Sequence, residues 1–213
     1  MEALAQRLQA IPGVVAVTLG GSRARGTHRA DSDWDFGLYY RGRLDADPVR
    51  ALGFPGTVVD PGTWGRLMNG GAWWTIDGVK VDVLYRDFDV VEYWYSQAEH
   101  GRFEVDDLLG YQAGFPAYAL VGELALGRQL TGEPLPHPSF PGPLRVQAAR
   151  NWRWRAAFHR DYAKQHTARG DSRAAAALCT RADLEEARAR MADRGQWVLN
   201  EKGLLARAGL HPT

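Results

Sequence analysis

The sequence predicts an α+β fold, in which a mixed β-sheet with flanking helices is followed by a C-terminal helical bundle. Three observations support this prediction: β-branched runs that end at glycines, an Asp-Gly pair between two apolar runs, and an Ala- and Arg-rich composition after a proline-rich segment. The chain has 213 residues, of which 45% are hydrophobic, so it is long enough to bury a core. A charged fraction of 24% excludes wholesale disorder.

The first part of the chain mixes helical and extended patterns. We expect helices over residues 3–9, 88–98 and 117–126, and strands over residues 14–19, 34–40, 72–76 and 79–85. Asp77 and Gly78 separate the last two strands and predict a type I′ hairpin turn, because both residues of that turn need a positive φ. Trp73 and Trp74 then point to opposite faces of the hairpin, so we expect at most one of them to be buried.

A proline-rich segment divides the chain. Glu133–Pro143 holds five prolines in eleven residues, and proline removes a backbone donor, so neither a helix nor a central strand continues through it. We therefore predict a first domain over residues 1–133, a linker over 134–143 and a C-terminal helical domain over 144–213.

The C-terminal domain shows helical periodicity. Trp154, Phe158 and Tyr162 recur every four residues and fall on one helical face. Further helices are expected from Ser172 to about Met191 and from Trp197 to Ala208.

Charge and composition limit the class of protein. The net charge is +1, but residues 1–142 carry 12 Lys and Arg against 18 Asp and Glu, whereas residues 143–213 carry 14 against 7. An acidic first part and a basic second part would suit a site for a metal and a polyphosphate between two domains, and a chance distribution of charge is the alternative. No apolar run approaches the roughly 20 residues that span a bilayer. The N-terminus has no signal-peptide pattern, and a single cysteine excludes an internal disulfide. We expect a cytoplasmic protein without a membrane partner.

The stretch from Leu19 to Tyr40 contains a pattern typical of phosphate binding. Gly20 and Gly21 end a strand, and Ser22 then stands where an N-cap residue would start a helix. Glycines let the backbone approach a ligand, and the free N–H groups of a helix N-terminus bind anions. A plain tight turn is the alternative. Arg23 and Arg25 follow and are candidates for phosphate contact, although a solvated helix face explains them equally well.

Three aspartates strengthen this pattern. Asp33 and Asp35 alternate along an expected strand, so both carboxylates project from one face. Asp82 interrupts an otherwise apolar strand, and a buried carboxylate needs a partner or a metal. If the two strands pair, the three carboxylates converge, and Mg²⁺ prefers such oxygen ligands. The alternatives are a solvated strand end for Asp33 and Asp35, and an ion pair with Lys80 for Asp82.

Together, Gly20-Gly21-Ser22, Asp33-x-Asp35 and Asp82 resemble the signature of the nucleotidyltransferase superfamily of DNA polymerase β. The resemblance covers roughly residues 12–86. The surrounding SRARGT and DSDWD are similar to the small bacterial members, and the helical C-terminal part resembles, more loosely, the nucleotidyltransferases that act on aminoglycosides and lincosamides. It implies a nucleotidyltransferase-like fold, ATP or another nucleoside triphosphate as substrate, and Mg²⁺ as cofactor, with two ions.

The resemblance also assigns roles to residues of this chain. Gly20, Gly21 and Ser22 would bind the nucleotide, with Arg23 and Arg25 beside them. The catalytic residues and metal ligands would be Asp33, Asp35 and Asp82, with Asp82 also activating the acceptor hydroxyl.

We therefore expect an adenylyltransferase-type enzyme that moves AMP from ATP to a hydroxyl of a small molecule, such as an aminoglycoside- or lincosamide-like antibiotic, and so confers antibiotic resistance. One alternative is an antitoxin-like nucleotidyltransferase whose acceptor is a partner protein. Another is an inactive nucleotide-binding module. A nucleic-acid partner is disfavoured because the sequence shows no dense basic stripe.

Overall fold

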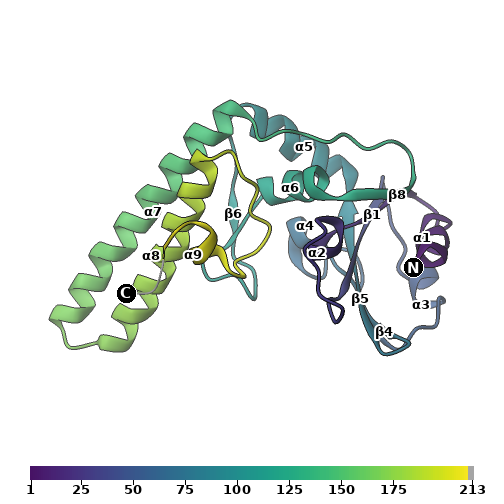
Figure 1. Cartoon of the computed structure of the whole chain (residues 1–213), viewed down its shortest axis with the longest axis horizontal. Helices are drawn as coiled ribbons and strands as arrows, with labels where there is room; N and C mark the ends of the chain where they lie inside the picture. Colours follow the sequence, from purple (N-terminus) through teal and green to yellow (C-terminus); the bar gives the residue numbers. More distant parts are fainter. Residues whose placement is uncertain (211–213) are drawn as a thin grey trace. The chain divides into compact units, whose positions relative to one another are not determined.

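A computed structural model describes residues 1–210. The chain forms two compact units (Figure 1). The sheet unit comprises Met1–Tyr93 and Glu123–Pro138, and the helical unit comprises Trp94–Gly122 and Ser139–Thr213. One boundary between the units thus falls inside the predicted linker, and the segment before Gly122 packs with the C-terminal helices. No helix within the described residues is long and apolar enough to cross a bilayer.

The secondary structure has the mixed composition that the sequence predicts. The strands are β1 (Val14–Leu19), β2 (Trp34–Tyr40), β3 (Gly56–Val58), β4 (Gly71–Ile76), β5 (Val79–Asp87), β6 (Val105–Asp106), β7 (Phe115–Pro116) and β8 (Arg128–Gly132). The helices are α1 (Glu2–Gln9), α2 (Gly21–Ala24), α3 (Asp47–Arg50), α4 (Gly65–Met68), α5 (Phe88–Glu99), α6 (Tyr118–Leu126), α7 (Gly142–Ala168), α8 (Ser172–Asp193) and α9 (Leu204–Arg207).

The main sheet has the strand order β3-β4-β5-β2-β1-β8. β2 and β5 run parallel, and the other neighbours are antiparallel, so the predicted mixed sheet is confirmed. The predicted hairpin is also present, because Asp77 and Gly78 have φ values of 50° and 78°. The sequence did not predict β3 and β8, which are short strands at the two edges of the sheet and lack an apolar run.

One face of the sheet forms the core of this unit. Phe36 and Leu38 of β2 and Val83 of β5 are fully buried there and pack with Leu8 of α1. Because side chains alternate along a strand, the residues between these positions face the opposite side of the sheet. Asp35 of β2 and Asp82 of β5 are therefore placed on the face away from this core.

The helical unit is built on α7 and α8, which lie side by side as a hairpin (Figure 1). The helix α8 begins after Asp171, whose carboxylate accepts the backbone N–H of Ala174 at 3.1 Å. This hydrogen bond, together with His166, lowers the pKa of the Asp171 carboxyl. On α7, the rings of Trp154, Phe158 and Tyr162 stack on one another on an exposed face.

The predicted helix from Trp197 to Ala208 is wrong, because only Leu204–Arg207 is helical. Gly203 adopts a left-handed conformation with φ of 63° immediately before it, which prevents a continuous helix. The residues before Gly203 instead form an irregular segment, in which Glu201 and the Leu199 carbonyl oxygen accept hydrogen bonds from residues 111–113.

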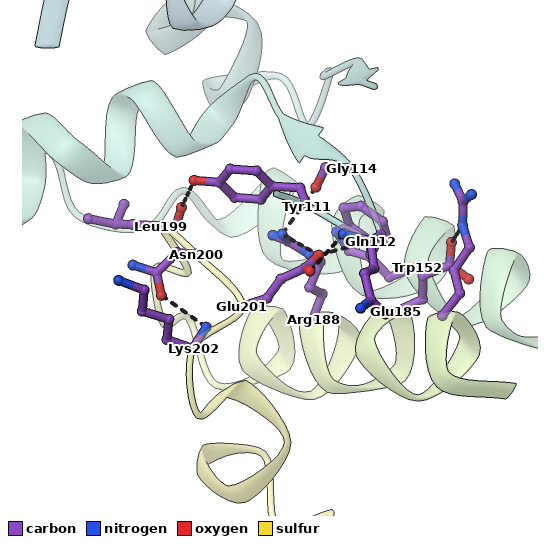
Figure 2. Close-up of polar contacts among 12 residues, drawn as sticks. Tyr111, Gln112, Gly114, Trp152, Glu185, Arg188, Leu199, Asn200, Glu201 and Lys202 are labelled. Carbon is purple, nitrogen blue, oxygen red and sulfur yellow. Dashed lines mark hydrogen bonds and ion pairs between the residues drawn. The ribbon is translucent and has the colours of Figure 1, made fainter. Parts of the chain in front are cut away.

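Glu201 makes the central contacts of that segment (Figure 2). Its carboxylate accepts the backbone N–H groups of Gln112 at 2.8 Å and Ala113 at 2.9 Å, and it lies 3.4 Å from Nη2 of Arg188. The Arg188 side chain is fully buried, and it also donates to the carbonyl oxygen of Gly114 at 3.1 Å. Glu201 therefore joins α8, the segment before β7 and the C-terminal segment through one carboxylate.

We expect Glu201→Ala to destabilise the helical unit by about 3–5 kcal/mol, because it leaves a buried guanidinium without its counter-charge. Glu201→Gln is the comparison variant: it also removes the charge, but it keeps one oxygen acceptor for one of the two backbone N–H groups and the volume of the side chain, so it should cost less. Urea unfolding followed by circular dichroism measures both variants. Equal stability of Glu201→Ala and the unmodified chain would show that this network contributes nothing.

Candidate active site

The turn after β1 lies directly against β2. The N–H of Gly20 donates to the carbonyl oxygen of Asp35 at 2.7 Å and so extends the β1–β2 ladder by one residue. Gly21 follows with φ of 61°, and a Cβ at this position would lie 1.8 Å from Oδ2 of Asp35. Only glycine therefore lets the turn pass this close to the carboxylate.

The short helix α2 begins at Gly21, and the residue before it, Gly20, has an extended conformation and occupies the N-cap position. The prediction that Ser22 is the N-cap residue is therefore wrong, because Ser22 is the second residue of the helix. A glycine cap contributes no side-chain oxygen, and the N-terminal N–H groups of α2 receive no side-chain cap. A role of Ser22 in nucleotide binding stays a prediction.

The two arginines of the motif hold the backbone around it. Nε of Arg23 donates to the carbonyl oxygens of Ser32 at 3.1 Å and Asp33 at 3.2 Å, and its guanidinium lies over the Trp34 ring at 4.4 Å. Nε of Arg25 donates back to the carbonyl oxygen of Gly21 at 3.1 Å. Arg23 thus fixes the loop that carries Asp33. Contact of either arginine with a nucleotide stays a prediction.

Asp35 and Asp82 lie opposite each other in the parallel β2–β5 pair. Adjacent strands are about 4.8 Å apart, and partners in register point to the same face, so the two carboxylates are neighbours. Both side chains are half-buried. Such a pair of oxygen donors suits a hard divalent cation, and the Gly21 turn leaves the space beside Asp35 free of a side chain.

Asp33 precedes β2 by one residue and is also half-buried. Nevertheless, within residues 1–210 no three or more His, Cys, Asp or Glu side chains are grouped as a metal site. The strand pairing brings Asp35 to Asp82, but it does not gather all three carboxylates. Like charges repel, so a cation would have to compensate that repulsion for the three to converge. The assignment of the three aspartates as metal ligands stays a prediction.

A buried ion pair, which the sequence did not predict, lies farther along the same face. The Arg86 side chain is 1% exposed and holds Glu123 through two hydrogen bonds, of 2.5 and 2.8 Å. Burial, with Glu123 adding to it, raises the pKa of the neighbouring Tyr39 hydroxyl. Tyr39 therefore stays protonated at neutral pH and cannot serve as a base. The sequence feature that could have indicated this ion pair is Glu123, the one acidic residue in the apolar stretch YALVGELAL, because a carboxylate in such a stretch needs a partner.

Comparison with known proteins gives one family match, over the first part of the chain. Residues 1–100 match the family model described as a nucleotidyltransferase domain, which confirms the predicted resemblance over that region. The match includes the glycine turn and all three aspartates. A similar solved structure is a nucleotidyltransferase-like protein from Exiguobacterium sibiricum 255-15, with 12% identity and a TM-score of 0.47. The alignment covers 98% of this chain and 60% of that one, so this chain spans about 60% of its length. Among curated proteins, no sequence match was found.

Proposed function

We propose, from the premise that residues 1–100 are a nucleotidyltransferase domain, that the chain moves AMP from ATP to a hydroxyl group of a small molecule. The observation that carries this proposal is the placement of Asp35 between Asp82 and the Gly20-Gly21 turn. Transfer of a nucleotidyl group needs little covalent chemistry from the protein, but it needs positioning and charge neutralisation. The glycine turn supports positioning of the nucleotide, and the paired carboxylates support charge neutralisation through a bound cation.

In this proposal each part of the site has one task. Gly20, Gly21 and Ser22 bind the triphosphate through their backbone. Asp33, Asp35 and Asp82 hold Mg²⁺, and two bound ions would supply the charge that stabilises the attacking and leaving oxygens. The carboxylate of Asp82 accepts the proton of the acceptor hydroxyl.

The acceptor that we propose is an aminoglycoside- or lincosamide-like antibiotic, which would make the enzyme a resistance factor. Residues 1–142 carry 18 Asp and Glu against 12 Lys and Arg, and this net negative charge attracts a cationic acceptor and repels an anionic one. An acceptor that carries ammonium groups therefore suits this site better than a phosphorylated or carboxylated one.

Release of pyrophosphate tests the proposal. The full chain is incubated with ATP, Mg²⁺ and each member of a panel of aminoglycosides, lincosamides and neutral glycosides. We expect release that depends on both the acceptor and Mg²⁺, and transfer of AMP to the acceptor, detected by mass spectrometry. Absence of release with every acceptor and every common nucleoside triphosphate would contradict the proposal.

We expect Gly21→Ala to reduce the transfer rate by at least about tenfold, since a positioned charged group contributes that much or more. The new Cβ would meet the Asp35 carboxylate, and a non-glycine residue is strained at φ of 61°. Gly26→Ala is the matched control, because Gly26 also has a positive φ of 68° but no atom within 4 Å of its Cβ position. The measurement is the initial rate of pyrophosphate release, and equal rates for the two variants would argue against a close approach at Gly21.

A further inference from the structure

An aromatic side chain stands next to Asp82 on the side away from Asp35. β4 pairs with β5, and Trp73 is the register partner of Asp82. Trp74 is 3% exposed and packs in the core, so the alternation along β4 puts Trp73 on the same face as the carboxylates. This confirms the prediction that the two tryptophans point to opposite faces.

A second tryptophan covers the first. Trp64, at the start of α4, stacks on Trp73 with a ring-centroid distance of 4.5 Å and an interplanar angle of 19°. Trp64 is 43% exposed, so its ring face is accessible to solvent. The Trp73 ring passes 3.3 Å from the position that a Cβ at Gly71 would occupy, so the missing side chain there leaves room for the ring. We call Trp64 and Trp73 the indole pair.

The strand order arranges these groups in a row across one face of the sheet. From β4 through β5 and β2 to the end of β1, the row runs from Trp73 to Asp82, then to Asp35 and to the Gly20-Gly21 turn. With about 4.8 Å between strands, Trp73 and Asp35 are two strands, or about 10 Å, apart. The carboxylates therefore lie between the glycine turn and the indole pair.

In nucleotidyl transfer the acceptor and the leaving pyrophosphate lie on opposite sides of the α-phosphorus, so the order of these groups along the sheet indicates where each would bind. The acceptor oxygen forms a bond to the α-phosphorus while the bond from that phosphorus to the pyrophosphate oxygen breaks, and the hydroxyl proton passes to a carboxylate. Attacking and leaving oxygens lie on opposite sides of the phosphorus. If the glycine turn holds the β- and γ-phosphates, the leaving group is on the β1 side. The acceptor then approaches from the β4 side, where the indole pair lies.

We propose that Trp64 and Trp73 form the acceptor platform, and that the acceptor hydroxyl is carried by an uncharged or cationic compound with a flat ring face. This inference rests on the proposed function. An indole offers a broad apolar face on which a ring packs, and it attracts cations through its π-electrons. Neither tryptophan belongs to the glycine and aspartate motifs that the sequence singles out.

The test separates the acceptor's Michaelis constant from that of ATP. With the acceptor that the pyrophosphate assay identifies, we expect Trp64→Ala to raise the acceptor KM about tenfold, the loss expected when one stacking partner is removed. The KM for ATP and kcat should stay close to their original values. Trp64→Phe should recover most of the loss because it restores an aromatic face. Trp154→Ala is the matched control, since Trp154 is equally a solvent-exposed tryptophan but belongs to the helical unit.

Two kinetic results would overturn the inference. A raised KM for ATP with an unchanged acceptor KM would mean that the nucleobase, and not the acceptor, stacks on the indole pair. No change in either constant would mean that the pair has no part in binding. The thermal midpoint of each variant checks that the fold is retained.

Calorimetric titration with the compounds of the panel tests the platform without catalysis. Binding of a ring compound that Trp64→Ala weakens about tenfold and Trp154→Ala leaves unchanged would support the platform. If no pyrophosphate were released in the same conditions, only the proposed function would fail. Binding that is equal in both variants would overturn the platform while leaving the transfer reaction untouched.

Discussion

Asp35→Asn should abolish Mg²⁺-dependent nucleotidyl transfer while leaving the fold intact, and Asp33→Asn should do the same. Asp35 lies between the Gly21 turn and Asp82, so its charge serves any cation that binds at the site. The same charge repels the neighbouring carboxylate when no cation is present. Removing it should therefore leave the thermal midpoint unchanged or slightly raised. Single-turnover transfer and thermal unfolding measure the two effects separately.

Asp31→Asn is the matched control for these variants. Asp31 lies in the same acidic stretch, but its side chain is exposed and pairs with Arg29 at 3.5 Å. We expect this variant to keep full activity. Retention of full activity in Asp35→Asn as well would remove the basis for treating these aspartates as the catalytic group.

Asp82→Asn should lower the transfer rate by about 10²-fold or more, the lower range of what a positioned base contributes. The substitution keeps the size and shape of the side chain but removes its charge and its ability to accept a proton. Binding of the metal-bound triphosphate should largely survive, because Gly21, Ser22, Asp33 and Asp35 are unchanged. Calorimetric titration with a non-hydrolysable nucleotide, beside a single-turnover assay, measures binding and chemistry independently.

The comparison of nucleotide affinity with transfer rate in Asp82→Asn assigns the role of Asp82. Loss of rate with retained affinity is the result expected of a base on the acceptor side. A parallel loss of affinity and rate would make Asp82 part of the nucleotide clamp. If neither changes, the pairing of Asp82 with Asp35 has no chemical consequence, and the site is a nucleotide-binding module.

Local patterns in the sequence were sufficient for most of the sheet. Val14–Leu19 and Trp34–Tyr40 appear as strands with the predicted limits, because the β-branched apolar run of the first and the apolar alternation of the second are properties of each segment alone. The Asp77-Gly78 turn follows from backbone preferences of two adjacent residues. The edge strands β3 and β8 were missed because they carry no apolar alternation and are stabilised by their neighbours in the sheet.

Local reasoning was insufficient where a residue's contacts lie outside its own segment. The sequence left Arg23 open as a phosphate contact or a solvated helix residue, and the structure adds that it donates to the carbonyl oxygens of Ser32 and Asp33. The helix expected before Ala208 is interrupted because Gly203 adopts a left-handed conformation and Glu201 is held by Gln112 and Ala113. The sequence pattern around Arg23 or Glu201 gives no indication of these hydrogen bonds, because their partners lie outside each segment.

The sequence by itself determined the fold class, the strands that carry Asp35 and Asp82, and the resemblance to nucleotidyltransferases. Only the tertiary structure decided which residues face one another: Asp35 with Asp82, and Trp73 beside them. The physical reason is that strand register between distant segments is set by burial of the whole core face, since a slip of one residue would move every apolar side chain of the strand to the solvent side. The register between two strands is therefore a property of the assembled sheet and cannot be inferred from either strand alone.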